Sequence, residues 1–356
     1  MQLETADFGF IYHEKKQKQL FKLMIDQFRH LSKSKNIKIV LFTLGHLDLE
    51  ELAVTGTMIA GDNISQGPCK VPAYIYNFAL HSTVDKIDKM RNLRKLEAIT
   101  VINPVNRFIQ GIIFEMLASC PSFRPYLLPS KSFNTSTFID YDQKYDTFFL
   151  LPENSFLPPK AVVIKKFQNN DYMIYIGQNG QLRKEDDLVS YIKKMINKKK
   201  YIIFKGIEHL RIGNDPLETK ILLQKSEKGE WCSTVIAVKK GIFSRKELSY
   251  SKSNDATGDL ISPVNEEQLS DISIQIGRFL DFYIPFIGSY TFDFIFDENN
   301  CPYLIHISGF EQDQNFFQLL DFETQLTLLN NSFNYLYYQR NNFVTKRVQP
   351  DGLDQS

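Results

Sequence analysis

Short apolar segments alternate with amphipathic stretches through the first 125 residues, and this alternation limits the possible folds more than any other feature. Four of the apolar segments are typical of strands: residues 8–12, 37–42, 73–76 and 98–102. Two stretches place apolar side chains at helical spacing: residues 18–31 and 107–117. Strands separated by helices predict an open α/β sheet with parallel members in this part of the chain.

A loop with three prolines, Pro121, Pro125 and Pro129, follows this region and indicates a domain boundary. The pattern changes beyond residue 147. Four further segments predict the strands of a small α+β unit: residues 148–151, 161–166, 172–176 and 201–204. Residues 185–200 are rich in Lys and polar on most sides, so we expect a helix on the surface of this unit.

The last part of the chain favours antiparallel hairpins. Two are predicted: residues 218–225 with 231–239, and residues 291–296 with 303–308. Gly229 lies in the first connecting loop and can adopt positive φ there. Apolar periodicity predicts two helices, at residues 266–282 and 316–340. The polar residues 341–356 predict a disordered tail.

Composition argues against several classes of function. The 42 basic and 41 acidic side chains nearly cancel, so we expect neither nucleic acid nor an anionic membrane as a partner. The longest apolar runs are too short for a membrane span, and the N-terminus carries no secretion signal. The four cysteines lack metal-site spacing and are read as reduced, structural thiols: Cys69, Cys120, Cys232 and Cys301. We therefore expect a cytoplasmic protein that is not a zinc hydrolase.

The second hairpin carries the most informative chemistry. Alternate Phe side chains of its first strand face the core, which leaves Asp293 on the opposite face. If the turn is centred on residues 299–300, Asp293 lies opposite His306 and shares a face with Ser308, while Glu311 follows the strand end. Such a group could hold a cation, or Asp293 and His306 could simply satisfy each other by a hydrogen bond. A register slip of one residue would exchange the two faces.

The order of these segments resembles the YheC/YheD-type ATP-grasp proteins, which are associated with the endospore coat of bacilli. The resemblance covers roughly residues 8–338. It rests on the order and spacing of six stretches: residues 71–77 (VPAYIYN), 102–108 (INPVNRF), 125–129 (PYLLP), 201–207 (YIIFKGI), 216–231 with its Gly-Glu-Trp turn, and the hairpin at 291–308.

The resemblance implies an ATP-grasp fold, α/β plus α+β, in which two subdomains hold ATP between them. It implies the following divisions: an N-terminal α/β pre-ATP-grasp domain at residues 1–125, a small lid subdomain at 126–205, a C-terminal subdomain at 206–340 and the tail at 341–356. Enzymes of this fold join a carboxylate to an amine or thiol through an acyl phosphate, with ATP and Mg²⁺ as cofactors. The family context implies spore coat or other sporulation proteins as partners and a spore-associated location.

Particular residues acquire roles by the same resemblance. Lys131, Lys165 and Glu218 would bind ATP, the hinge residues Phe204, Lys205 and Ile207 would hold the adenine, and Lys220 would be the catalytic cation. The metal ligands would be Asp293, His306 and Ser308, with Glu311 as a substitute carboxylate.

The sequence departs from the family pattern at that site. Residues 163–171 contain no glycine, although the corresponding loop of the family is rich in glycine and covers the phosphates. Lys220 replaces an Arg and Glu218 an Asp. His306 stands at the position of the metal-binding Glu, and Ser308 at that of an Asn. Because Mg²⁺ prefers oxygen ligands, an imidazole here should lower its affinity, and a change to Mn²⁺ or Zn²⁺ is the alternative.

Three functions therefore stay open at this stage. The first is a degenerate ATP-grasp protein that acts in sporulation by binding rather than turnover. The second is a working ATP- and Mg²⁺-dependent ligase that uses Lys131, Lys165, Glu218, Lys220, Asp293 and Glu311. The third is a protein that binds ATP without turnover, through the hinge at residues 203–207 and one or two lysines.

Overall fold

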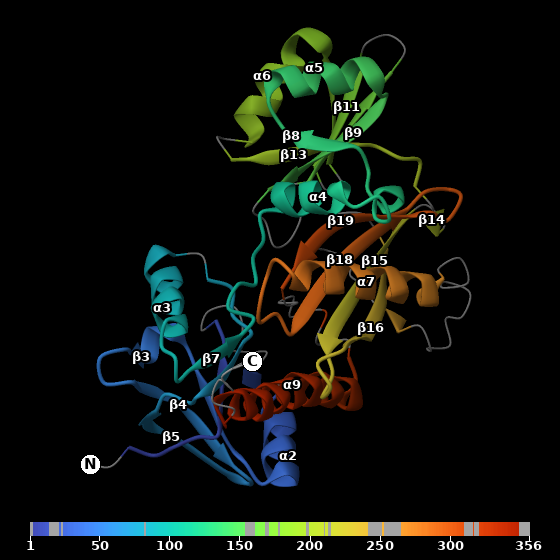
Figure 1. The fold of residues 1–356 in the computed structure, drawn as a ribbon. Helices are drawn as coiled ribbons and strands as arrows, with labels where there is room; N and C mark the ends of the chain where they lie inside the picture. The colour runs from blue at the N-terminus through green and yellow to red at the C-terminus, as the bar shows by residue number, and fades with distance from the viewer. Residues whose placement is uncertain are drawn as a thin grey trace, which may run out of the picture.

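Figure 1 shows the computed structural model, in which three β-sheets follow one another along the chain. The structure describes residues 3–348 except 14–20, 23, 82, 154–160, 168–170, 177–178, 197–198, 210, 213–214, 241–250, 253–264, 310–315 and 317–319. No helix in these described ranges is long and apolar enough to cross a membrane.

The first sheet is an open α/β sheet, as predicted. Its parallel part has the order β2-β1-β6-β7, formed by β1 (Phe8–Ile11), β2 (Lys38–Phe42), β6 (Tyr74–Asn77) and β7 (Thr100–Ile102). An antiparallel extension that the sequence did not predict follows β2: β3 (Leu47–Asp48), β4 (Ala53–Ala60) and β5 (Asn63–Lys70). The associated helices are α2 (Ile25–Lys35) and α3 (Val84–Arg94), with the short 3-10 helix η1 (Leu44–His46) after β2.

The second sheet is antiparallel, with the order β12-β11-β10-β9-β13-β8. Its strands are β8 (Ser130–Ser132), β9 (Thr147–Pro152), β10 (Val162–Lys166), β11 (Asp171–Ile176), β12 (Asn179–Lys184) and β13 (Tyr201–Lys205). Helices α5 (Thr135–Lys144) and α6 (Glu185–Ile196) cover one face and share a core with it, to which Phe138 and Ile192 belong. The Lys-rich segment therefore forms a helix that buries one apolar side.

The third sheet contains both predicted hairpins. Its order is β17-β16-β15-β18-β19, and β14 pairs with β15. The strands are β14 (Arg211–Ile212), β15 (Asp215–Lys225), β16 (Trp231–Lys240), β17 (Ser251–Lys252), β18 (Ser289–Phe296) and β19 (Pro302–Ser308). Helix α7 (Glu266–Asp281) packs on one face, where Leu269, Ile272 and Ile276 join the main core.

Helix α9 (Phe322–Val348) lies between the first and third sheets (Figure 1). Its Leu328 and Phe333 share one buried cluster with Phe8 of β1 and Leu222 of β15. The helix ends eight residues beyond the expected limit at residue 340, and the disordered tail stays a prediction. The rest of the predicted tail, residues 349–356, lies outside the described residues.

Helix α4 (Gln110–Ser119) and the 3-10 helix η2 (Arg124–Tyr126) connect the first sheet to the second. Ile113, Phe114 and Leu117 of α4 belong to the core that unites the second and third sheets, although the sequence placed α4 in the N-terminal domain. The proposed domain limits at residues 125 and 205 stay predictions.

Candidate functional site

Three adjacent strands of the third sheet carry a row of ionisable side chains. Lys220 on β15 is the register partner of Asp293 on β18, and Asp293 is the partner of His306 on β19. The predicted pairing of Asp293 with His306 is therefore confirmed. A bulge follows immediately, between residues 293 and 294, and shifts the rest of the β18–β19 register by one residue.

Both carboxylate oxygens of Asp293 are engaged. Lys220 Nζ donates to Oδ1 at 2.6 Å, and His306 Nδ1 lies 3.2 Å from Oδ2. Because a carboxylate can only accept, the second contact requires the proton on Nδ1 of the imidazole. The row is an internal ion pair, Lys220 with Asp293, that is extended by a hydrogen bond to His306.

The ion pair is buried, with 7% and 6% of the Lys220 and Asp293 side chains exposed. Burial alone would raise the pKa of Asp293, since it disfavours the charged carboxylate. The neighbouring Lys220 ammonium and the His306 hydrogen bond outweigh burial, and together they hold that pKa well below its usual range. Asp293 is consequently a carboxylate at any ordinary pH.

The other members of the predicted group are placed unequally. Ser308 is buried and lies opposite Thr291, on the face that Asp293 shares. Glu218 is buried on the face of Lys220, two residues earlier on β15. Glu311 lies outside the described residues, so its expected role as a substitute carboxylate stays a prediction.

The donor set in this row does not fit Mg²⁺. The ion needs several oxygen ligands in near-octahedral geometry, usually including one or two carboxylates. In the described part of the chain, no three Asp, Glu, His or Cys side chains come close enough together to hold a metal ion. The carboxylate best placed for the purpose, Asp293, already contacts the ammonium group of Lys220. A cation at that carboxylate would compete with Lys220.

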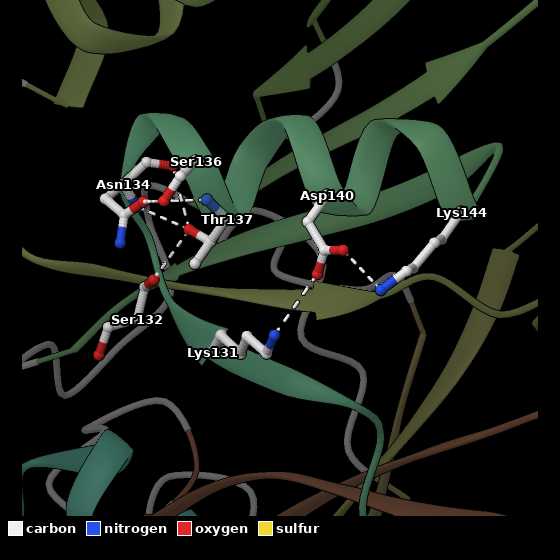
Figure 2. A network of polar contacts seen from close by, with 7 residues as sticks. All are labelled: Lys131, Ser132, Asn134, Ser136, Thr137, Asp140 and Lys144. Carbon is white, nitrogen blue, oxygen red and sulfur yellow. Dashed lines mark hydrogen bonds and ion pairs between the residues drawn. The ribbon is translucent and has the colours of Figure 1, made fainter.

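Lys131, expected at the phosphates, instead contacts helix α5. Figure 2 shows its ammonium group reaching from β8 to Asp140, which also pairs with Lys144. The N-cap of this helix is Asn134, whose side chain accepts the Thr137 N–H at 2.9 Å in a capping box. Lys131 thus takes part in an exposed ion-pair network at the start of the second sheet.

Lys165 and Phe204 share the other face of the second sheet, which the strand register places away from α5 and α6. Lys165 is exposed there. Phe204 is fully buried and stacks on Phe149, with ring centroids 5.1 Å apart, while Phe114 of α4 meets it edge-on. Phe204 therefore belongs to the core between α4 and the sheet.

The hinge residues use several of their polar groups within the protein. The Lys205 N–H donates to Pro129 O at 2.9 Å, and the Gly206 N–H donates to Thr147 O at 2.7 Å. The Lys205 ammonium lies 5.7 Å from the centre of the Tyr145 ring. Ile207 is half-buried against the main core. The expected ATP ligands of the second sheet thus lie on two different faces.

Sequence reasoning missed a set of buried amides that join the sheets. Asn103, in the left-handed conformation with φ 54°, donates to Ser289 Oγ at 2.6 Å and accepts the Gly288 N–H at 2.7 Å. The Gln110 side chain exchanges two hydrogen bonds with the Ile307 backbone, at 2.7 and 3.0 Å. Asn103 falls within the stretch at 102–108 that carried the family resemblance, but sequence alone gives no sign of partners so far along the chain.

Solved structures with the same arrangement are ATP-grasp ligases. The structure matches that of D-cycloserine synthetase DcsG with a TM-score of 0.56 at 8% identity, covering 94% of this chain and 99% of that chain. VanG D-Ala:D-Ser ligase from Enterococcus faecalis gives a TM-score of 0.54 at 8% identity with the same coverage. D-alanine–D-alanine ligase from Bacillus anthracis, complexed with ATP, gives 0.52 at 11% identity, again with 94% and 99% covered. The fold is therefore the ATP-grasp fold.

The family follows from the sequence itself. The sequence model of the family described as YheC/D like ATP-grasp matches residues 98–338, about two thirds of the chain. The protein belongs to this family, and the resemblance seen in the motifs is confirmed. No curated protein matches the sequence significantly.

Proposed function

We propose that this protein acts by binding, as a degenerate member of the ATP-grasp family that does not turn over Mg-ATP. The observation that carries the proposal is the 2.6 Å contact between Lys220 and Asp293 inside a buried row that ends at His306. An internal cation takes the place beside the carboxylate that an Mg²⁺ ion would need. The family context adds sporulation proteins to the proposal as binding partners.

Two further observations support a weak or absent ATP site. The segment at residues 163–171, which would cover the phosphates, contains no glycine, so its backbone cannot easily approach them. Phe204, which would border the adenine, is fully buried against Phe149 and Phe114. Neither observation depends on the ion pair.

The alternatives make different demands on the same residues. A carboxylate ligase, the activity named for the structural neighbours, needs Asp293 released from Lys220 and a second carboxylate supplied by Glu311. Binding of ATP without turnover needs only the hinge and a cation, and the exposed position of Lys165 favours this second candidate. The two alternatives differ in their need for a metal ion.

The test measures the thermal midpoint of unfolding with ATP alone, with ATP and Mg²⁺, and with ATP and Mn²⁺. A ligand that binds only the native state stabilises it by about 2.7 kcal/mol at a hundredfold excess over Kd. We expect no metal-dependent rise in the midpoint for the natural sequence. The double variant His306→Glu with Ser308→Asn, which restores the family's oxygen ligands, should gain such a rise.

The outcomes separate the three functions. A metal-dependent rise in the natural protein that disappears in Asp293→Ala would overturn the proposal and favour the ligase. A rise that needs no metal and disappears in Lys165→Ala would favour ATP as a ligand without turnover. The exposed Lys193→Ala on α6 is the control, because it removes the same charge from the same subdomain.

A further inference from the structure

A second candidate site lies away from the row formed by Lys220, Asp293 and His306. A cavity of about 320 Å³ opens between α3 and the segment that leaves β7, beside the carboxyl end of β6. In open α/β sheets, ligands bind outside the carboxyl ends of the parallel strands, and pockets of 300–1,000 Å³ are typical of small-molecule sites. None of its lining residues belongs to the row of Lys220, Asp293 and His306.

The cavity is lined by cationic side chains. Arg91 and Arg94 come from the last turn of α3, and Arg107 comes from the segment after β7. No Asp or Glu is among the described residues that line it. Arg91 also pairs with Asp88 on the surface of α3 at 2.6 Å, so an anion in the cavity would share this guanidinium group with Asp88. For a chain whose formal net charge is only +1, three arginines around one cavity are a marked local concentration.

Two buried acceptors lie in the same wall. His81 Nε2 lies 3.3 Å from Asn77 Oδ1, so Nε2 carries the proton and Nδ1 is the acceptor. Neither His81 Nδ1 nor Asn106 Oδ1 has a hydrogen-bond partner among the described residues. Both atoms are buried inside the wall, and Asn106 Oδ1 lies against Gly309, so they shape the wall and do not face the open cavity.

The wall that carries Asn106 is held firmly. Its Nδ2 group donates to Asn77 O at 2.8 Å and Ala79 O at 3.0 Å, and its backbone carbonyl accepts the Gly309 N–H at 2.9 Å. The cavity is thus a preformed feature at the junction of the first and third sheets. Its remaining wall is apolar and includes Leu80 and Met90.

We infer that this cavity binds a small organic molecule that carries an oxyanion, a phosphate or a carboxylate, with Arg91, Arg94 and Arg107 around the charged group and the apolar wall against the carbon skeleton. Guanidinium groups match both oxyanions because their donors bind two oxygens at once. The inference is independent of nucleotide binding at the ion row.

The experiment titrates the full chain with phenyl phosphate, phenylacetate and benzyl alcohol by calorimetry. We expect saturable binding of at least one anion and none of the neutral alcohol. The variant Arg91→Gln with Arg94→Gln alters two exposed positions, so it should fold, and it should weaken binding at least tenfold. Ile87→Glu, at an exposed position of the rim, should do the same by repulsion. The charge-matched control is Arg278→Gln with Arg340→Gln, both exposed and outside the cavity lining.

The two anions identify the source of the charge. Preference for phenyl phosphate supports a phosphorylated ligand, and preference for phenylacetate supports a carboxylate. Binding of neither anion would overturn the inference. Equal weakening in the cavity variant and in the charge-matched control would also overturn it, since general attraction by surface arginines would then explain the binding.

Discussion

The buried ion pair between Lys220 and Asp293 makes a sharp prediction for the variant Lys220→Met. The substitution keeps most of the length of the side chain but removes the ammonium partner of the Asp293 carboxylate, whose side chain is only 6% exposed. Breaking a buried pair by removing one member costs about 3–5 kcal/mol, because an uncompensated charge stays in the interior. For a unit of about 150–250 residues, this corresponds to a fall of roughly 6–20 °C in the thermal midpoint.

The matched control is an ion pair of similar geometry at the surface. Lys33 and Asp62 approach to 2.7 Å, yet 68% and 62% of their side chains are exposed. Lys33→Met should therefore cost less than about 1 kcal/mol. The double variant Lys220→Met with Asp293→Asn removes both charges and should recover at least half of the loss seen in the single variant.

Urea and thermal unfolding, followed by circular dichroism, measure these differences. The pH dependence supplies a second readout. Because the folded pKa of Asp293 lies below its ordinary value of 3.8, its contribution is complete above that pH and is lost as the pH falls further. Asp293→Asn should flatten the acid limb of the stability curve. If Lys220→Met lowers the midpoint no more than Lys33→Met does, the buried ion pair does not stabilise the fold more than a surface pair does.

Three shorter predictions concern other buried groups. Burial lowers the pKa of His81 to about 4, so the free energy of unfolding should fall by up to about 3 kcal/mol as the pH falls from 6.5 to 4. Urea titrations at the two pH values should show that His81→Gln abolishes most of this decrease. Gln110→Ala should lower stability by about 2–4 kcal/mol, since two backbone groups of edge strand β19 lose their partner, whereas exposed Gln66→Ala should change the thermal midpoint little. Burial raises the pKa of Cys69 to about 11, so at pH 8 a thiol reagent should modify exposed Cys301 in the native protein and Cys69 only after unfolding; early modification of Cys69 would contradict its burial.

The hairpin of β18 and β19 was predictable because local rules determine it. The alternation of Phe side chains fixes which face is buried. The turn does not fix the pairing by itself, because Phe296 pairs with Pro302, one residue away from the expected register, and Asp293 meets His306 only beyond the bulge. The bulge after Asp293 did not follow, because nothing in the sequence marks it. The parallel sheet at the N-terminus was predictable for the same kind of reason.

The hairpin of β4 and β5 was missed because its signal is weak. Most of β5 is exposed, and its sequence includes Gly67 and Pro68, which are unusual in strands. The strand is stable because its backbone pairs with β4, and not because of its own side chains. Edge strands of this kind carry little of the alternation on which sequence reading depends.

The contacts made by the predicted ATP ligands could not be predicted from the sequence either. Lys131 pairs with Asp140 because α5 follows β8 directly, and the polar sequence of α5 gave no helix signal. Phe204 was expected beside adenine, yet the packing of α4 decides which ring it meets. Such contacts depend on how separate elements pack, and periodicity within one segment cannot specify that.

Whether the row of Lys220, Asp293 and residue 306 can bind a divalent cation depends on the side chain at position 306. With a Glu there, as in the family pattern, the row of Lys220, Asp293 and the Glu would carry a net negative charge, and a divalent cation could bind the two carboxylates. With His306 there, Asp293 is the only carboxylate of the row, and both of its oxygens find donors within the protein. A metal ion would then have to displace Lys220 from Asp293 and break a buried ion pair. Retention of Asp293 is therefore compatible with loss of the metal, because one substitution turns a ligand into half of an internal ion pair.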